Sequence, residues 1–106
     1  MILGFDFGLR GIGVAVGQAV TRTASPVGVI TAQKGMPDWV AMDALIKAWR
    51  PTTLVVGLPL NMDGSMSDMA FKAQKFAKRL EERYRLEVHC MDERLSTHEA
   101  IAWYRE

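Results

Sequence analysis

Two apolar runs open the chain: Ile2-Leu3-Gly4-Phe5-Asp6-Phe7-Gly8 and, after one residue, Arg10-Gly11-Ile12-Gly13-Val14-Ala15-Val16-Gly17. The first run is short and continuous, which is typical of a strand buried on both faces. Gly8 and Gly11 favour a tight turn, after which the second run returns beside the first. We therefore expect an antiparallel hairpin that carries Asp6 at its bend.

The position of Asp6 is unusual, because a carboxylate within a hydrophobic sheet is costly unless it is protonated or meets a cation. One interpretation is a metal ligand or the acid of a phosphate site. The other is a turn aspartate that caps its own backbone. We favour the first, because the centre of a sheet is a poor place for a charge without a role.

The composition predicts a single soluble domain over residues 1–106. Hydrophobic residues make up 49% and charged residues 24% of the chain, and the net charge is +1, so charge alone indicates no particular partner. One cysteine cannot form an internal disulfide, and no signal peptide or membrane span is visible in the sequence. We expect a cytoplasmic protein without membrane contact, in which Cys90 is a buried structural thiol.

The rest of the chain alternates between strand and helix patterns. Strands are predicted over 27–31, 53–57 and 86–91, with Pro26 at the start of the first, and a loop over 33–37. Apolar spacing predicts helices over 39–49, with Asp38 at its N-terminus, and over 68–85. We take Trp39 and Trp49 as core residues.

This order predicts an α/β fold whose mixed five-stranded sheet is flanked by helices. The first three strands form an antiparallel meander, and the fourth and fifth lie parallel to the first, giving the order 3-2-1-4-5. The long helix is expected to pack on the sheet through Phe76, Leu80 and Tyr84. The polar segment 61–67 follows a strand's carboxyl end, where open α/β sheets bind ligands, and is long enough to be mobile.

Basic residues recur along the long helix at Lys72, Lys75, Arg79 and Arg83. This stripe fits either a solvated helix face or a track for phosphates, and spacing alone does not separate the two.

Acidic residues end two strands of the predicted sheet: Asp6 the first, and Asp92 and Glu93 the fifth. If these strands are neighbours, the carboxylates converge and need a cation, for which oxygen ligands favour Mg²⁺ or Mn²⁺. Adjacent strand residues point to opposite faces, so Asp92 should be less central than Glu93. Arg10 and Arg94 adjoin the acids and could bind phosphate. His89 and His98 lack metal-ligand spacing, and we read them as structural.

Three blocks together resemble the bacterial YqgF/RuvX family, whose ribonuclease-H-like fold is shared with the Holliday junction resolvase RuvC. The blocks are Phe5-Asp6-Phe7-Gly8 with Ile12-Gly13-Val14-Ala15-Val16, Val56-Gly57-Leu58-Pro59 with Asn61-Met62-Asp63-Gly64, and Asp92-Glu93-Arg94-Leu95-Ser96-Thr97. The resemblance implies metal-dependent phosphodiester hydrolysis in the cytoplasm, either at the 5′ end of 16S ribosomal RNA or on Holliday junctions.

Carried over by position, the resemblance makes Asp6 and Glu93 the catalytic, metal-binding acids. Arg10, Arg94, Lys72, Lys75 and Arg79 are the expected substrate contacts. The family has a further catalytic aspartate in a C-terminal helical segment that this sequence does not include. The last predicted helix, capped by Ser96 and Glu99, also has no stop signal. We therefore expect a C-terminally truncated domain with weak activity.

Two other functions stay open at this point. An Asp-x-Gly hairpin also opens the sugar-kinase and actin-like ATPases, although these need a second domain. A nucleic-acid-binding or ribosome-assembly factor could keep the fold without turnover. The sequence does not choose between RNA and DNA, or between a monomer and a homodimer.

Overall fold

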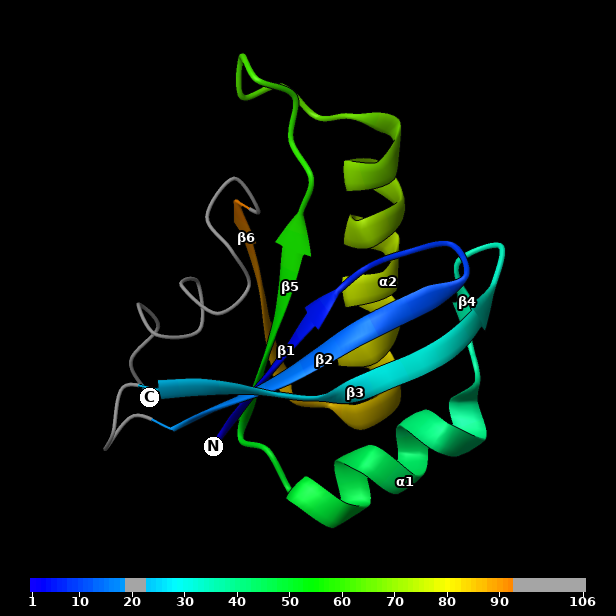
Figure 1. Ribbon diagram of the computed structural model, residues 1–106, viewed down its shortest axis with the longest axis vertical. Coiled ribbons are helices and arrows are strands. Elements are labelled where there is room, and N and C mark those ends of the chain that lie inside the picture. Colours follow the sequence, from blue (N-terminus) through cyan, green and yellow to red (C-terminus); the bar gives the residue numbers. More distant parts are fainter. Residues whose placement is uncertain (19–22, 93–106) are drawn as a thin grey trace.

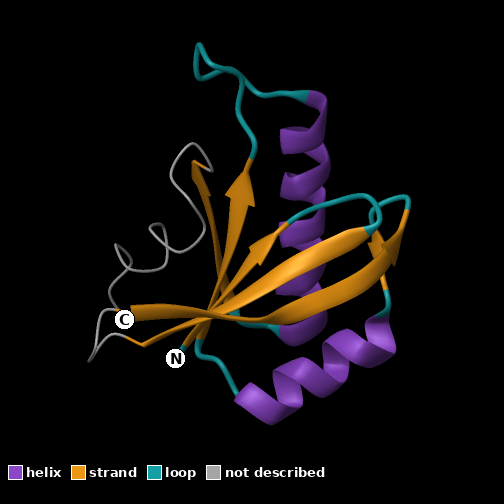
Figure 2. Ribbon diagram, viewed as in Figure 1, coloured by secondary structure: helices purple, strands orange, loops and turns teal. Residues whose placement is uncertain are grey.

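The computed structural model describes residues 1–18 and 23–92, which form one mixed sheet and two helices (Figures 1 and 2). The sheet order is β4-β3-β2-β1-β5-β6. In chain order the elements are β1 (Ile2–Asp6), β2 (Gly11–Gln18), β3 (Thr23–Gln33), β4 (Met36–Pro37), α1 (Trp39–Trp49), β5 (Thr53–Leu58), α2 (Asp68–Tyr84) and β6 (Glu87–Asp92).

Strand β1 lies in the interior of the sheet, as the opening hairpin predicts. It pairs antiparallel with β2 and parallel with β5, and β5 pairs parallel with β6. The predicted order 3-2-1-4-5 is therefore confirmed for the five expected strands. The predicted strand number is wrong, because β4 adds a sixth strand beyond β3.

The differences from the prediction concentrate in the segment that contains β3 and β4. The third strand was expected over 27–31 but spans Thr23–Gln33, with Pro26 inside it, next to a register shift opposite Val14 and Ala15. Proline is tolerated there because it lies at a bulge. The expected loop over 33–37 is a tight turn, after which Met36 and Pro37 pair with Gln33 and Ala32.

Both helices begin at side-chain caps. The Asp38 carboxylate accepts hydrogen bonds from the backbone N–H groups of Val40 and Ala41, and Ser67 caps α2 by accepting one from Ala70. Neither helix is long and apolar enough to cross a membrane, within the part of the chain that is described. The two predicted helices are confirmed to within a residue.

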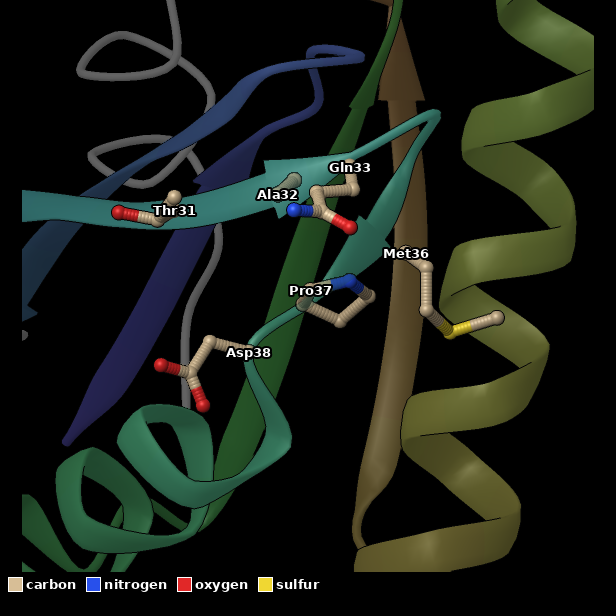
Figure 3. A pocket seen from close by; sticks show the side chains of 6 residues that line it. All are labelled: Thr31, Ala32, Gln33, Met36, Pro37 and Asp38. Atoms are coloured by element: carbon tan, nitrogen blue, oxygen red, sulfur yellow. The ribbon is translucent and has the colours of Figure 1, made fainter.

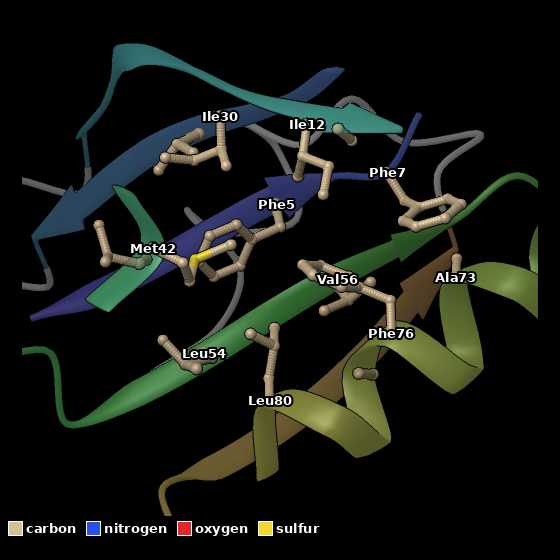
Figure 4. Packing of buried hydrophobic residues seen from close by; sticks show 14 of the residues in the cluster. Phe5, Phe7, Ile12, Ile30, Met42, Leu54, Val56, Ala73, Phe76 and Leu80 are labelled. Atoms are coloured by element: carbon tan, nitrogen blue, oxygen red, sulfur yellow. The ribbon is translucent and has the colours of Figure 1, made fainter. Parts of the chain in front are cut away.

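The core lies on the face of the sheet that α1 and α2 cover (Figure 4). Phe76 and Leu80 of α2 are buried there, and Tyr84 is partly buried against the same core, as predicted. Met42 brings α1 into this cluster. Trp39 and Trp49, expected in the core, are only partly buried at its edge.

The other face of the sheet carries a smaller cluster. Ile2, Ala15 and Val55 are buried on it, with Met91 packed against them. Cys90 precedes Met91 in β6 and is exposed, so the prediction of a buried thiol is wrong. The physical reason is that β6 ends the sheet order, and an edge strand covers its residues less completely.

Candidate active site

Asp6 is the last residue of β1, and the packing of its two neighbours sets its direction. The Phe5 and Phe7 rings both lie against Phe76 of α2, with centroid distances of 5.8 and 5.4 Å. Because side chains alternate along an extended chain, Asp6 projects to the opposite face from these rings. The core on one side of the sheet thus aims a carboxylate out of the other side.

Glycines flank Asp6 on both neighbouring strands. Its register partners are Gly13 in β2 and Gly57 in β5. Residues paired in this way share a face, and glycine has no side chain to fill the space there. A Cβ at Gly13 would stand 3.5 Å from the Asp6 Cβ. The row therefore places no side chain next to the Asp6 carboxylate on either neighbouring strand, although Gly57 itself is buried.

The electrostatic state of Asp6 is that of an acid without a counter-ion. Partial burial raises the pKa of its carboxyl above the ordinary value. Within residues 1–18 and 23–92, neither a hydrogen bond nor an ion pair engages this side chain. The described residues also hold no cluster of three or more metal-ligating side chains. Asp6 is thus a single exposed carboxylate, and no such cluster of described residues includes it.

The turn after Asp6 is held by backbone contacts. A Cβ at Gly8 would overlap the carbonyl oxygen of Gly11, so the turn requires glycine at position 8. The Leu9 and Arg10 carbonyls accept hydrogen bonds from the N–H groups of Gly35 and Ala32, each at 2.9 Å. The Arg10 side chain is exposed, four residues beyond Asp6. The hairpin can therefore present Arg10 beside the acid from a fixed backbone.

The second predicted acid block falls at the end of the described chain. Asp92 pairs with Leu58, a residue packed against the main core, and so lies on the opposite face from Asp6. This agrees with the expectation that Asp92 is not central. Glu93 and Arg94 lie outside the described residues, as do the capping box at Ser96 and Glu99, and His98. His89 lies on a strand face, as expected.

The basic stripe divides into two parts. Lys72, Lys75 and Arg79 are exposed and make no hydrogen bond or ion pair among the described residues. They extend from α2, which packs on the face opposite to the one Asp6 faces, so the sheet lies between the acid and the stripe. A ligand contacting both must pass around an edge of the sheet, either the carboxyl ends of the strands or the β6 side.

Arg83, the fourth member of that stripe, has a different role. Its Nε and Nη2 donate to the two Asp43 carboxylate oxygens at 2.9 and 2.7 Å, and its guanidinium stacks 4.7 Å from the Trp39 ring centroid. The Tyr84 hydroxyl donates to the same carboxylate at 2.6 Å. Arg83 stands in the same row of basic residues in the sequence, but its side chain joins α2 to α1.

Sequence reasoning missed this inter-helix cluster entirely. Asp43 and Arg83 are 40 residues apart, and no local spacing joins them. The sequence offers only a weak indication of this contact, namely that Asp43 and Arg83 each lie near the edge of the apolar face of a predicted helix. Only the packing of the two helices brings the charges together.

A pocket of about 390 Å³ lies where β3, β4 and the start of α1 meet (Figure 3). Its lining consists of Thr31, Ala32, Gln33, Met36, Pro37 and Asp38. The only acid among them, Asp38, is used as the cap of α1, with its Oδ1 at 3.1 Å from the Val40 nitrogen. The pocket contains none of the predicted site residues and offers no reactive group.

The curled mixed sheet with its two helices has the ribonuclease-H-like fold. Two solved structures of Thermus thermophilus RuvC share it, one of them in complex with a Holliday junction substrate. That complex has a TM-score of 0.57 at 14% identity and covers 86% of this chain and 63% of its own. The other has a TM-score of 0.54 at 13% identity, covering 99% and 72%. The chain belongs to the RuvX family, described as Holliday junction resolvase, which it matches over residues 1–106.

Curated relatives in this family carry a ribosomal RNA name. A protein of Hahella chejuensis is 54% identical over 105 residues, which cover 99% of this chain and 66% of the relative. A protein of Azotobacter vinelandii is 56% identical over 100 residues, covering 94% and 70%. Each is named "Putative pre-16S rRNA nuclease". The chain therefore spans about two thirds of the length of these relatives.

Proposed function

We propose that this chain is the catalytic domain of a nuclease that hydrolyses phosphodiester bonds with the help of a divalent cation. The observation that carries the proposal is Asp6: an acid at the end of the central strand, flanked by glycines, with a raised pKa and no counter-ion among the described residues. Family membership and the ribonuclease-H-like fold support the same activity.

Asp6 and Glu93 are the residues proposed to hold the cation. The exposed carboxylate of Asp6 fits this role, since oxygen ligands suit Mg²⁺ and Mn²⁺ and a cation offsets the cost of the partly buried charge. Asp6 and Glu93 would hold this ion, which when bound would supply Lewis-acid activation of water and charge stabilisation at the leaving oxygen. Glu93 is proposed from the resemblance and lies outside the described residues.

The protein's own part is to position the nucleic acid. Arg10, on the fixed turn after Asp6, and Arg94 are proposed to hold phosphates beside the scissile bond through charge-assisted hydrogen bonds. Lys72, Lys75 and Arg79 are proposed to bind more distant phosphates without regard to sequence, after the strand has crossed the sheet's carboxyl edge.

The proposed substrate is the 5′ end of the 16S ribosomal RNA precursor, in the cytoplasm. The names of relatives at 54% and 56% identity favour it. Cleavage of Holliday junctions is a second candidate, favoured by the description of the family and by the likeness to RuvC. A resolvase that cuts symmetric strands needs a two-fold homodimer, whereas trimming one RNA end needs only a monomer.

A cleavage panel tests both candidates. A precursor ribosomal RNA end and a four-way DNA junction are each incubated with Mg²⁺, Mn²⁺ or EDTA, using this chain extended to the length of its relatives. Metal-dependent cleavage of the RNA end, with the junction left intact, supports RNA processing. The reverse result supports the resolvase. Binding that EDTA leaves unchanged, without cleavage in either metal, would mean a non-catalytic binding protein.

A further inference from the structure

The loop that follows β5 carries the most exposed of the large hydrophobic side chains described. Met62 is 97% exposed and lies in a turn of the segment between Pro59 and Ser67. This segment stands beyond the end of β5 at the top of Figure 1. Burying a methionine side chain is worth about 1.5–3 kcal/mol, so an apolar group held in water is a site where a ligand can gain free energy.

The loop is braced by its own hydrogen bonds. The Asn61 N–H donates to the Ser65 carbonyl, and the Gly64 N–H donates to the Asn61 carbonyl, both at 2.9 Å. The Asn61 side-chain amide donates to the Ser65 hydroxyl at 3.0 Å, and the Asp63 carboxylate accepts from the Ser65 N–H at 2.9 Å. These bonds connect Asn61, Asp63, Gly64 and Ser65 across the turn of the segment that the sequence marks as long enough to be mobile.

The base of the same loop is closed as well. The Ser67 hydroxyl donates to the Pro59 carbonyl at 2.5 Å and accepts from the Ala70 N–H at 3.0 Å. One side chain therefore ties the exit of β5 to the first turn of α2. A braced loop loses little conformational entropy when its tip inserts into a partner.

The loop also stands close to the candidate active site along the sheet. Gly57 is the register partner of Asp6, and Met62 follows it by five residues. Five residues span at most about 18 Å at full extension. Stacked nucleotides advance by about 3.4 Å along a strand, so a strand held at Asp6 reaches the loop within about five nucleotides.

We propose that Met62 is an apolar wedge that inserts between neighbouring bases of the nucleic acid held at Asp6. Apolar side chains of this kind unstack base steps in many nucleic-acid-binding proteins, and a single narrow tip suits a base step better than a flat protein surface. The wedge selects substrates whose bases already part near the cleavage point, namely branched or frayed ends. It rests on the proposed nuclease function and specifies its substrate.

The test measures binding instead of cleavage, so the outcome does not depend on hydrolysis. Asp6→Asn in the chain extended to the length of its relatives is mixed with RNA hairpins that have a frayed 5′ end, and with an unbranched single strand of equal length. A 2-aminopurine base is placed at successive positions from the cleavage point. Met62→Ala, Met62→Leu and the control Val40→Ala, which truncates an apolar side chain 81% exposed on α1, are compared in that background.

We expect the fluorescence of 2-aminopurine to rise at one step within five nucleotides, and Met62→Leu to preserve the rise. Met62→Ala should abolish it and weaken frayed-end binding about tenfold, with single-strand affinity changed less than about twofold. Val40→Ala should change neither. Unaltered fluorescence and affinity in Met62→Ala overturn the wedge, and so does equal weakening on both probes.

The remaining results separate the wedge from the nuclease. A fluorescence rise that depends on Met62, in a chain whose extended wild type cleaves neither substrate, supports the inference and refutes the proposed hydrolysis. If neither the extended wild type nor its Asp6→Asn variant binds the hairpin or the single strand, the wedge and the proposed nuclease function are both refuted. Capture of a protein partner by Met62, with no effect of Met62→Ala on RNA binding, also overturns the wedge.

Discussion

Two aspartates of this chain occupy opposite electrostatic environments. Asp43 receives two hydrogen bonds from Arg83 and one from Tyr84, and the pKa of its carboxyl falls to about 2, mainly because of the Arg83 contact. Asp6 has no such partner among the described residues, and partial burial raises its pKa. The same side chain is stabilised as an anion at one place and destabilised as an anion at the other.

The comparison separates a charge that is paired within the protein from one that has no partner among the described residues. The Asp43–Arg83–Tyr84 cluster neutralises itself and needs no ligand; burial and the hydrogen bond to Asp43 also raise the pKa of Tyr84. It ties the outer edges of α1 and α2 together. Asp6 is held in place by the Phe5 and Phe7 packing while its charge is left uncompensated. This environment supports the proposal that Asp6 binds a cation.

The largest expected effect is on catalysis by the extended chain. Asp6→Asn should lower metal-dependent cleavage about a thousandfold, since several kcal/mol of transition-state stabilisation is lost with the metal ligand. Asp43→Asn, the matched control, should leave the rate per folded molecule unchanged. Single-turnover cleavage with Mg²⁺ measures the rate, and circular dichroism measures the fraction of each variant that is folded. Full cleavage by Asp6→Asn would remove this residue from the mechanism.

The next effect concerns chain length. The resemblance implies a further catalytic aspartate in a C-terminal helical segment, which would add a carboxylate to Asp6 and Glu93 around the proposed cation. The 106-residue chain should therefore cleave at least about tenfold more slowly than a version extended with the C-terminal segment of a relative. Replacing the acid of that segment with alanine should return the rate to the lower value. Equal rates for the short and extended chains would contradict this prediction.

The third effect is on stability and belongs to Asp43. A carboxyl with a lowered folded-state pKa stabilises the fold above its ordinary pKa of 3.8, and this contribution disappears as the pH falls toward 2. Asp43→Ala should lower the Tm by a few degrees at pH 7, and the difference from wild type should shrink below pH 4. Differential scanning fluorimetry across this range measures it. A difference that persists at pH 2 would assign the effect to packing, not to the ion pair.

The fourth effect is on the salt dependence of nucleic-acid binding. Charge reversal at Lys75 or Arg79 should remove one bound phosphate and so flatten the plot of log affinity against log salt by roughly 0.7 to 0.9. Lys47→Glu, on the exposed side of α1, is the control with the same change of charge. Fluorescence anisotropy at several salt concentrations gives the slopes. Equal slopes in all three variants would make the stripe an ordinary solvated face.

The parts of this fold that depend on local pattern could be predicted from the sequence. The opening hairpin, both helices and the interior position of β1 follow from apolar spacing and turn residues. Strand β4 was not predicted because a two-residue strand has no periodicity. The length of β3 was not predicted because Pro26 was interpreted as the start of the strand. Both errors arise where pairing with a neighbouring strand decides the structure.

For the candidate site, the sequence likewise predicted the position of a residue but not its direction or its contacts. The end of a buried strand marked Asp6 as unusual, yet its direction became clear only from the packing of Phe5 and Phe7 on Phe76. The bracing around Met62 depends on contacts between Asn61, Asp63 and Ser65 that composition does not reveal. The partner of Arg83 lies on another helix, so no spacing along the chain could indicate its contact with Asp43.

The smallest expected effect is a gain in stability from removing the Asp6 charge. A carboxyl whose folded-state pKa is raised favours the fold when it is protonated, and this contribution is lost as the pH rises through the raised value. At pH 7 and without metal, Asp6→Asn should therefore melt slightly above the wild type, whereas Asp43→Asn should melt below it. Near pH 3 the Asp6→Asn difference should vanish, because both side chains are then uncharged. Added Mg²⁺ should raise the Tm of the wild type but not that of Asp6→Asn. Equal melting of the wild type and Asp6→Asn at every pH, with no effect of Mg²⁺, would show that the Asp6 charge costs the fold nothing, and the contrast between the two aspartates would then rest on Asp43 alone.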